Sequence, residues 1–225
     1  MYFSRIRLRT DADTGVLARQ LCNSDSYLEH QLLWRLFSGD AEARRDFLFR
    51  RDDLNGWPQF YLVSQRLPED ADNVWQIDHR EYRPRLRNGQ RLGFSLRANP
   101  VITRKDASGK HKRHDLVMDL KRQGNWKLTA RNARSSLYEL TQLAGQTWLS
   151  SRLERNGGKL ETLNSEGYMQ HRTSGKRNEK PIQYSSLDLD GTLTVADTEA
   201  FTQALYRGLG PAKAFGCGLL LVRRI

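Results

Sequence analysis

The order of strand-like and helix-like segments is the feature that most constrains how this chain can fold. Residues 1–9 alternate apolar and basic side chains, as a half-buried strand does. Residues 26–37 have the apolar spacing of a short helix. In chain order, the first half predicts a strand at 1–9, a short helix or loop at 11–21, a helix at 26–37, strands at 46–51 and 60–66 around a turn at 55–58, a short helix opening at 67 and a strand from 74.

The second half repeats this order with longer inserts. Its predicted elements are a strand at 91–102, a basic loop at 103–114, a helix at 136–155, extended segments at 160–163, 167–171, 182–189 and 192–195 around a tip at 172–180, a helix at 196–208 and a strand at 218–223. The order β, α, β, β, α, β is typical of a ferredoxin-like domain. We therefore predict an α+β protein of two tandem ferredoxin-like domains, residues 1–88 and 89–225, which divide at Asn88-Gly89.

The charge balance favours a polyanionic partner. The 225 residues contain 37 Lys and Arg against 26 Asp and Glu, a formal net charge of +11. Nucleic acid is the leading candidate. The sequence has no basic amphipathic helix separate from the folded segments, and no apolar stretch approaches membrane-spanning length. We therefore expect no membrane partner. The first residues lack the apolar core of a signal peptide, and Cys22 and Cys217 are far apart, so we expect reduced thiols and a cytoplasmic protein.

The helix at 26–37 carries two candidate reactive side chains in its first turn. Ser26 followed by Glu29 forms a capping-box pattern, which predicts that the helix starts at Tyr27. Tyr27 and His30 are then neighbours one turn apart, outside the apolar stripe. The positive end of the helix dipole disfavours a charged imidazole there and keeps it available as a base. From this window alone, two boundary residues that pack at the helix edge are the favoured interpretation.

The segment 208–218 contains four glycines and Lys213 between a predicted helix and the last strand. Glycines such as Gly210 and Gly216 let backbone amides approach a phosphate closely, and Lys213 adds charge. A tight turn that packs helix against sheet is an equally good interpretation. The spacing matches neither the Walker pattern nor the dinucleotide fingerprint, so no nucleotide cofactor is expected.

Two basic stretches, 104–113 and 172–180, look like hairpin projections. A charge run is usually solvated surface, but in a chain this basic we expect both to contact phosphates. His111 and His114 have a metal-like spacing without further ligands, so no metal site is predicted.

The run Leu187-Asp-Leu-Asp-Gly-Thr-Leu193 resembles the aspartyl-nucleophile signature of haloacid-dehalogenase phosphatases. In that family the other catalytic motifs lie far downstream. Too few residues follow Leu193 to hold them, so we interpret the match as a turn in a strand.

Four stretches together resemble a known family: Tyr27-Leu-Glu-His30, Phe94-Ser-Leu-Arg-Ala-Asn-Pro100, Leu187–Val195 and Gly208–Leu220. In order and spacing they are similar to the CasE family, the CRISPR repeat endoribonuclease of the type I-E Cascade complex. The resemblance covers nearly the whole chain. It makes a catalytic role the favoured interpretation of Tyr27 and His30 in the helix at 26–37.

The resemblance implies two RRM-like domains that bind the stem-loop of a CRISPR repeat and cut at the 3′ base of the stem without a metal or other cofactor. The 2′-hydroxyl attacks the adjacent phosphate and leaves a 2′,3′-cyclic phosphate, and the product stays bound within Cascade beside its other subunits. His30 matches the catalytic histidine and Tyr27 its partner. The candidate RNA contacts are Arg97, Lys105, Lys110, Lys112, Arg113, Arg172, Lys176, Arg177, Lys180, Gly210, Lys213 and Gly216.

Two alternatives to the nuclease follow from the same residues. One is a noncatalytic RNA-binding subunit of a CRISPR ribonucleoprotein, which would bind the hairpin and never cut it. The other is a phosphatase that uses Asp188, the less favoured of the two.

Overall fold

The computed structural model describes the chain except for residues 11–13, 23–25, 38–44, 106–107, 130–132, 134 and 174–180. The first half consists of β1 (Tyr2–Leu8), α1 (Gly15–Cys22), α2 (Ser26–Trp34), β2 (Phe47–Leu54), β3 (Trp57–Ser64) and β4 (Trp75–Glu81). The second half consists of β5 (Arg91–Ala98), β6 (Val101–Lys105), β7 (His111–Asp115), α3 (Leu116–Gln123), α4 (Leu137–Arg155), β8 (Gly158–Thr173), β9 (Ile182–Val195), α5 (Thr198–Arg207), the 3₁₀ turn η2 (Lys213–Phe215) and β10 (Leu220–Arg224).

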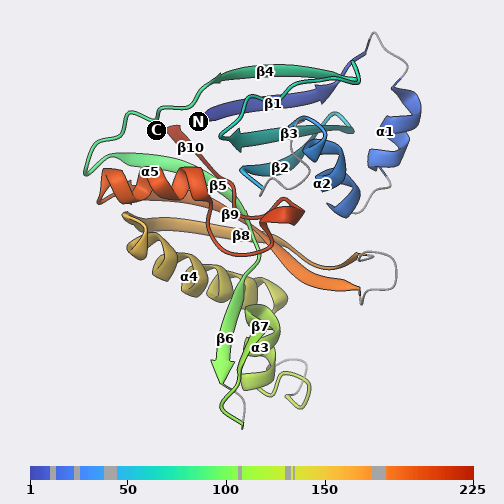
Figure 1. Cartoon of the computed structure of the whole chain (residues 1–225). Helices are drawn as coiled ribbons and strands as arrows, with labels where there is room; N and C mark the ends of the chain where they lie inside the picture. The colour runs from blue at the N-terminus through green and yellow to red at the C-terminus, as the bar shows by residue number, and fades with distance from the viewer. Residues whose placement is uncertain are drawn as a thin grey trace.

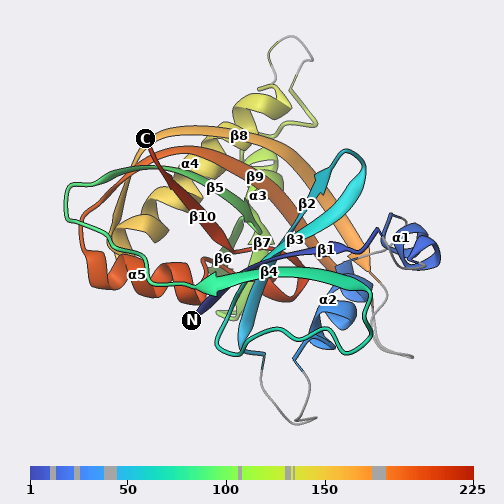
Figure 2. The same cartoon turned by 90° about the horizontal axis from the view of Figure 1, so that it is seen from above.

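Each half builds a four-stranded antiparallel sheet with the same strand order (Figures 1 and 2). The first sheet runs β2-β3-β1-β4 and the second β10-β5-β9-β8. If the sheet strands of each half are numbered along the chain, both read 4-1-3-2, the order of a ferredoxin-like fold. The prediction of an α+β chain with two tandem ferredoxin-like folds is confirmed.

Local sequence signals set several element ends. Asn55 and Gly56 both have positive φ, 52° and 81°, so β2 and β3 meet in a two-residue turn of the primed type that suits a twisted hairpin. The N-terminus of α4 is a complete capping box, in which the Ser136 hydroxyl accepts from the Glu139 amide and the Glu139 carboxylate accepts from the Ser136 amide.

Two predictions about elements were wrong. The segment after Leu67 forms no helix; it follows β3, and its Glu69 amide donates to the Leu36 carbonyl while the Trp75 amide donates to Asp70. The predicted strand at 91–102 divides at Pro100, which has no N–H for a strand ladder. The basic stretch 103–114, predicted as a loop that forms a hairpin-like projection, is largely the β6–β7 hairpin, with Val101 paired to Asp115, so the projection is confirmed.

Each sheet packs helices against one face, which makes two cores. In the first, Ile6, Phe60 and Leu62 meet Leu21 of α1 and Leu33 beside it on α2. In the second, α4 and α5 contribute large buried side chains that cover the sheet. These are Trp148, Leu149, Leu153, Phe201 and Leu205.

A third, smaller cluster joins the two halves. Leu48 and Val63, on the other face of the first sheet, pack against Leu219 just before β10, with Phe3 and Tyr61 at the edge. Arg50 donates to the Ser95 hydroxyl at 2.6 Å across the same junction. This contact covers part of the sheet face that a lone ferredoxin-like domain leaves open, near β2 and β3, while Arg5 and Asp78 on the same face remain 44% exposed.

Gly191 offers a direct test of the sheet geometry, because β8 has a register shift opposite it, between Leu160 and Thr162. A Cβ at Gly191 would lie 2.0 Å from the carbonyl oxygen of Thr162, whereas one at Gly15 would meet nothing within 4 Å. We expect Gly191→Ala to lower the free energy of unfolding by about 2–3 kcal/mol, as overpacking does. Urea unfolding should show Gly15→Ala near wild type; equal stability of the two variants would contradict the geometry.

Candidate functional site

Helix α2 is anchored to β2 by a buried ion pair. Arg51 Nη1 donates to Glu29 Oε1 at 2.6 Å and to the Leu21 carbonyl at 2.9 Å. Only 6% of Glu29 is exposed, and burial raises the pKa of its carboxyl while Arg51 opposes that rise. The helix begins at Ser26, one residue before the predicted start, and the Glu29 carboxylate is engaged by Arg51.

The imidazole of His30 packs among aromatic rings and keeps one nitrogen without a partner. Its centroid lies 5.7 Å from that of Trp34, 6.0 Å from Phe47 and 6.4 Å from Phe49. Nε2 is buried and makes no hydrogen bond to any described residue. Burial lowers the pKa of His30, and the charge of Arg45 lowers it further. The ring is therefore neutral at pH 7 and able to accept a proton, while Tyr27 lies half-buried one turn earlier.

Arg45 lies close enough to His30 to lower its pKa, and Lys213 lies close to Arg45. Arg45 is half-buried, burial lowers its pKa, and its charge also lowers the pKa of Lys213. Lys213 belongs to η2, which contacts both α2 and β2. No ion pair joins Arg45 to a carboxylate in the described ranges of the chain. The sequence analysis did not identify Arg45, whose only signal is an arginine just before β2, outside any recognised motif.

The glycine-rich segment has clear packing roles. Gly210 has φ +80°, and a Cβ there would lie 2.5 Å from Trp148 Cζ2; Gly216 has φ +76° and lies against Phe49. Lys213 Nζ donates to the Arg207 carbonyl at 2.6 Å, at the C-terminus of α5. These contacts favour the tight-turn interpretation for the glycines, and they place η2 beneath α2 (Figure 1).

Three adjoining cavities extend from α2 along the second half, and we call them together the furrow. The first, about 310 Å³, is lined by Glu29 and Arg51 on one side and by β8, β9 and η2 on the other. The second, about 580 Å³, shares His171, Arg172, Tyr184 and Phe215 with the first. The third, about 600 Å³, shares Val101, Arg113 and Pro211 with the second and is bounded by α4.

A stack of three rings lies between the first two cavities. His171 and Tyr184 have centroids 4.6 Å apart, and Tyr184 and Phe215 4.8 Å, both with planes inclined by 14°. His171 also shares a 2.7 Å hydrogen bond with the Ser186 hydroxyl. Burial lowers the pKa of His171, with Arg97 adding to the effect. The stack was not anticipated, because its rings come from three segments separated in the sequence.

The structure brings together some of the predicted RNA-contact residues and separates others. Arg97 and Arg172 line the first cavity, and Arg113 lines the second and third. Arg97 is already bound in a fork by Asp188, at 2.8 and 2.9 Å. The exposed cations Lys105, Lys110 and Lys112 lie on the β6–β7 hairpin, at the far end from α2; Lys176, Arg177 and Lys180 lie outside the described residues.

The phosphatase-like run lies inside β9 and is not a loop. Asp188 and Asp190 alternate along the strand opposite Arg97 and Ser95 of β5. The fork from Arg97 neutralises Asp188, so this carboxylate acts as an ion-pair partner in the sheet. The prediction of a turn in this run was wrong, because the residues pair continuously with β5 inside one uninterrupted strand.

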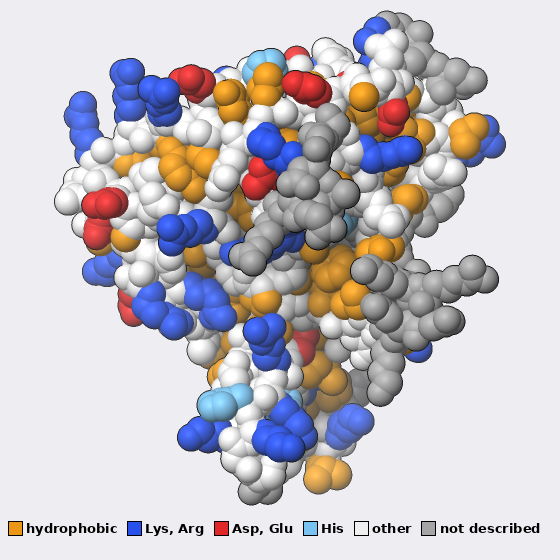
Figure 3. Space-filling view, viewed as in Figure 1, with side chains coloured by type: hydrophobic (Ala, Val, Ile, Leu, Met, Phe, Trp, Pro, Cys, Tyr) orange, Lys and Arg blue, Asp and Glu red, His pale blue; other side chains and the backbone are white. Residues whose placement is uncertain are grey.

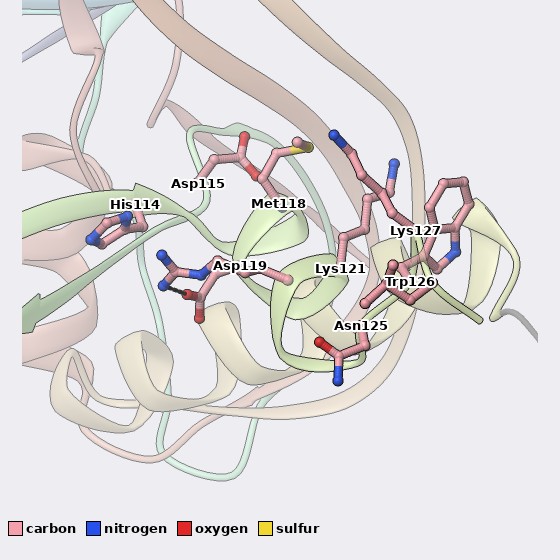
Figure 4. A pocket seen from close by; sticks show the side chains of 10 residues that line it. His114, Asp115, Met118, Asp119, Lys121, Asn125, Trp126 and Lys127 are labelled. Atoms are coloured by element: carbon pink, nitrogen blue, oxygen red, sulfur yellow. Dashed lines mark hydrogen bonds and ion pairs between the residues drawn. The ribbon is translucent and has the colours of Figure 1, made fainter.

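Another hollow, about 560 Å³, lies on α3 away from α2 (Figure 4). Met118, Trp126 and Leu128 give it an apolar lining, and Lys121 Nζ lies 4.9 Å from the Trp126 ring centre. Asp119 at its edge accepts from Arg104. It contains no residue of α2 or of the glycine-rich segment.

Two further features are absent from the described ranges. No three His, Cys, Asp or Glu side chains converge there in an arrangement that could hold a metal ion. No described helix has both the length and the apolar character needed to span a membrane.

Known proteins are similar to this chain in sequence and in fold. A family model described as CRISPR associated protein matches residues 1–224. The chain is 32% identical over 209 residues to the CRISPR system Cascade subunit CasE of Escherichia coli, covering 91% of this chain and 95% of that protein. It is 28% identical over 221 residues to the CRISPR-associated endoribonuclease Cse3 of Thermus thermophilus, and the match covers 91% of this chain and 92% of that protein. A structure of CRISPR endoribonuclease Cse3 bound to 19 nt RNA superimposes with a TM-score of 0.70 at 25% identity, covering 99% of this chain and 100% of the other.

The anchor of α2 can be tested by a double-mutant cycle. Arg51→Met should lower the free energy of unfolding by about 3 kcal/mol, because it leaves the Glu29 carboxylate buried without its partner. Adding Glu29→Gln should recover part of that loss. Arg5→Met, which breaks an ion pair with Asp78 in which both side chains are 44% exposed, should cost less than about 1 kcal/mol. Additive losses at Arg51 and Glu29 in urea unfolding would contradict the coupling.

The environment of His30 predicts its titration. NMR should place its midpoint below 6.5, and Arg45→Gln should raise it by removing a nearby positive charge. Because the unfolded chain takes up this proton at higher pH, the stability linked to neutral His30 is present above pH 6.5 and is lost as the pH falls from there to the folded pKa. Arg35→Gln, whose partner is Asp72, should leave the midpoint unchanged. A midpoint above 6.5 would contradict the burial of the ring.

Proposed function

Because the chain belongs to the CRISPR associated protein family, we propose that it is an endoribonuclease that binds the stem-loop of a CRISPR repeat and cuts precursor CRISPR RNA at the 3′ base of the stem. The observation that carries the proposal is the neutral imidazole of His30, with one nitrogen unpaired among the described residues, on a helix whose Glu29 lines the first cavity of the furrow. The relatives named an endoribonuclease and a Cascade subunit support it over matched lengths above nine-tenths of each chain.

The chemistry needs a proton acceptor and positive charge, and it needs no carboxylate cage for Mg²⁺. The 2′-hydroxyl attacks the neighbouring phosphorus, the P–O5′ bond breaks, and the products are a 2′,3′-cyclic phosphate and a 5′-hydroxyl. One proton leaves the 2′-oxygen and one reaches the 5′-oxygen. Charge grows on the phosphate oxygens in between, where fixed cations are most effective.

The roles follow from the surroundings of each group. Neutral His30 suits removal of the 2′-hydroxyl proton, for which a lowered pKa is an advantage. Tyr27 on the same face orients the phosphate. Arg45, whose charge reaches His30 and Lys213, supplies positive charge to the transition state. Since Nε2 is buried, RNA binding must expose it by turning the ring, or the reaction must use Nδ1.

The two halves divide the work in this proposal. Residues 1–88 present Tyr27 and His30, and residues 89–225 grip the RNA through the furrow and the β6–β7 hairpin. On the face in Figure 3, Lys and Arg side chains gather over α4 and that hairpin. After cleavage the protein holds the hairpin as a Cascade subunit in the cytoplasm, beside the other subunits of that complex.

The decisive experiment uses a labelled repeat hairpin in EDTA. His30→Ala should abolish cleavage, at least about 100-fold as expected for loss of a general base, while hairpin affinity stays near wild type. His79→Ala, an exposed histidine on β4, is the matched control and should cut normally.

Three outcomes would contradict the proposal. Undiminished cutting by His30→Ala would remove the assigned role of His30, and a requirement for added Mg²⁺ would overturn the mechanism. Binding by the wild type without any cutting would indicate the noncatalytic RNA-binding subunit. For the phosphatase alternative, we expect Asp188→Asn to leave hydrolysis of a generic phosphate ester at the wild-type level. Loss of that hydrolysis in the variant would support the phosphatase instead.

A further inference from the structure

Among the described residues, the third cavity of the furrow is lined by three arginines and by no acidic side chain. Arg113 comes from β7, and Arg152 and Arg155 from the last turns of α4. Gly210 and Pro211 of the glycine-rich segment close the opposite side. None of the three guanidinium groups is paired with a carboxylate within the described ranges.

The third cavity differs from the first in whether its arginines are paired with carboxylates. Around the first cavity Arg51 is paired with Glu29 and Asp53, and Arg97 with Asp188, so those charges are largely cancelled. Of the arginines that line the first cavity, Arg172 is the one without a carboxylate partner in the described ranges, whereas all three arginines of the third cavity lack one. A cavity of about 600 Å³ with like charges on its walls attracts an anion, and it is larger than one free phosphate needs.

The arginines of α4 are held in place without being neutralised. The Arg152 guanidinium lies 4.0 Å from the Trp148 ring centre, and its Nη1 donates to the Trp148 carbonyl at 3.2 Å. Arg155 Nε donates to the Ser151 carbonyl at 2.8 Å. Burial lowers the pKa of Arg152 to about 10, and the charge of Arg155 contributes. Both side chains remain charged at pH 7, in fixed positions, with donors to spare.

Trp148 adds an independent observation. Only 2% of this residue is exposed, it lines the same cavity, and its indole Nε1 has no hydrogen-bond partner in the part of the chain that the structure describes. A buried donor without an acceptor is unfavourable, and such donors are rare in folded proteins. The backbone of Gly210 approaches the same ring so closely that a Cβ there would lie 2.5 Å from Cζ2.

We propose that the third cavity is an RNA phosphate site, in which Arg113, Arg152 and Arg155 bind a phosphodiester group of the repeat hairpin remote from the scissile bond. This inference rests on the proposed function. A fork of guanidinium donors matches phosphate oxygens, and the site would hold the hairpin at one end of the furrow while α2 acts at the other. Its contribution is to affinity and to the register of the RNA, and the chemical step is untouched.

The test compares Arg152→Gln/Arg155→Gln with wild type and with Arg224→Gln, an exposed arginine on β10 that lines no part of the furrow. The double variant should bind the repeat hairpin about tenfold more weakly, and the slope of log affinity against log salt should fall by about one for each phosphate that the variant no longer binds. Single-turnover cleavage at saturating RNA should stay within about twofold of wild type. Arg224→Gln should change neither affinity nor slope.

Further measurements distinguish the remaining explanations. Arg152→Lys keeps the charge, so it should keep most of the salt slope; loss of the slope together with a lowered melting temperature would indicate a packing role and overturn the site. An unchanged slope in the double variant would also overturn it.

Titration with inorganic phosphate tests whether the cavity binds a free anion. Phosphate binding that depends on Arg152, with hairpin affinity unaffected, would assign the cavity to a small anion instead. Failure of wild type to cut the hairpin would count against the proposed function and not against the cavity.

Discussion

The packing of Leu48 and Val63 against Leu219 is the contact on which the rest of the arrangement depends. A ferredoxin-like sheet covers one face with helices and leaves the other face open, and here the second half covers the part of that open face near β2 and β3. Burying these apolar side chains removes them from water and sets the angle between the halves. Because η2 follows α5 directly, the same contact brings η2 beneath α2 and puts Phe49 against Gly216. The candidate active site is a consequence of this junction.

The electrostatics of the furrow change along its length. Near α2, arginines are tied to carboxylates, and those ion pairs position helix and strand. The positive charges without a carboxylate partner there, among the described residues, include Arg172 in the first cavity and Arg45, which lies near a histidine kept neutral by burial. Toward α4 the arginines have no such partners in the described ranges. This division suits a protein that must hold a polyanion firmly while performing proton transfer at one point, because binding charge and a neutral base are kept apart.

Much of the fold could be predicted from local patterns. The alternation of strand 1–9, the Asn55-Gly56 turn and the capping box at Ser136 are each readable from a few adjacent residues, and the structure has all three as β1, a primed turn and α4. The helix expected after Leu67 does not form, because a bond to a distant segment, the Glu69 amide donating to the Leu36 carbonyl, outweighs a weak local signal. The β6–β7 hairpin was expected as a projection but not as two paired strands, since β7 (His111–Asp115) is polar on both faces and gives no alternation.

The sequence by itself determined the tandem order of elements, the basic character and the placing of Tyr27 and His30 one turn apart, because these depend on composition and on short-range periodicity. Only the tertiary structure decided which charges are cancelled and which groups meet. Arg97, a predicted RNA contact, is bound by Asp188, which lies 91 residues away in the sequence. Arg45, the His171–Tyr184–Phe215 stack and the Arg152 cavity had no signal, because contacts between distant segments are set by how the two sheets pack and not by the spacing of residues along the chain.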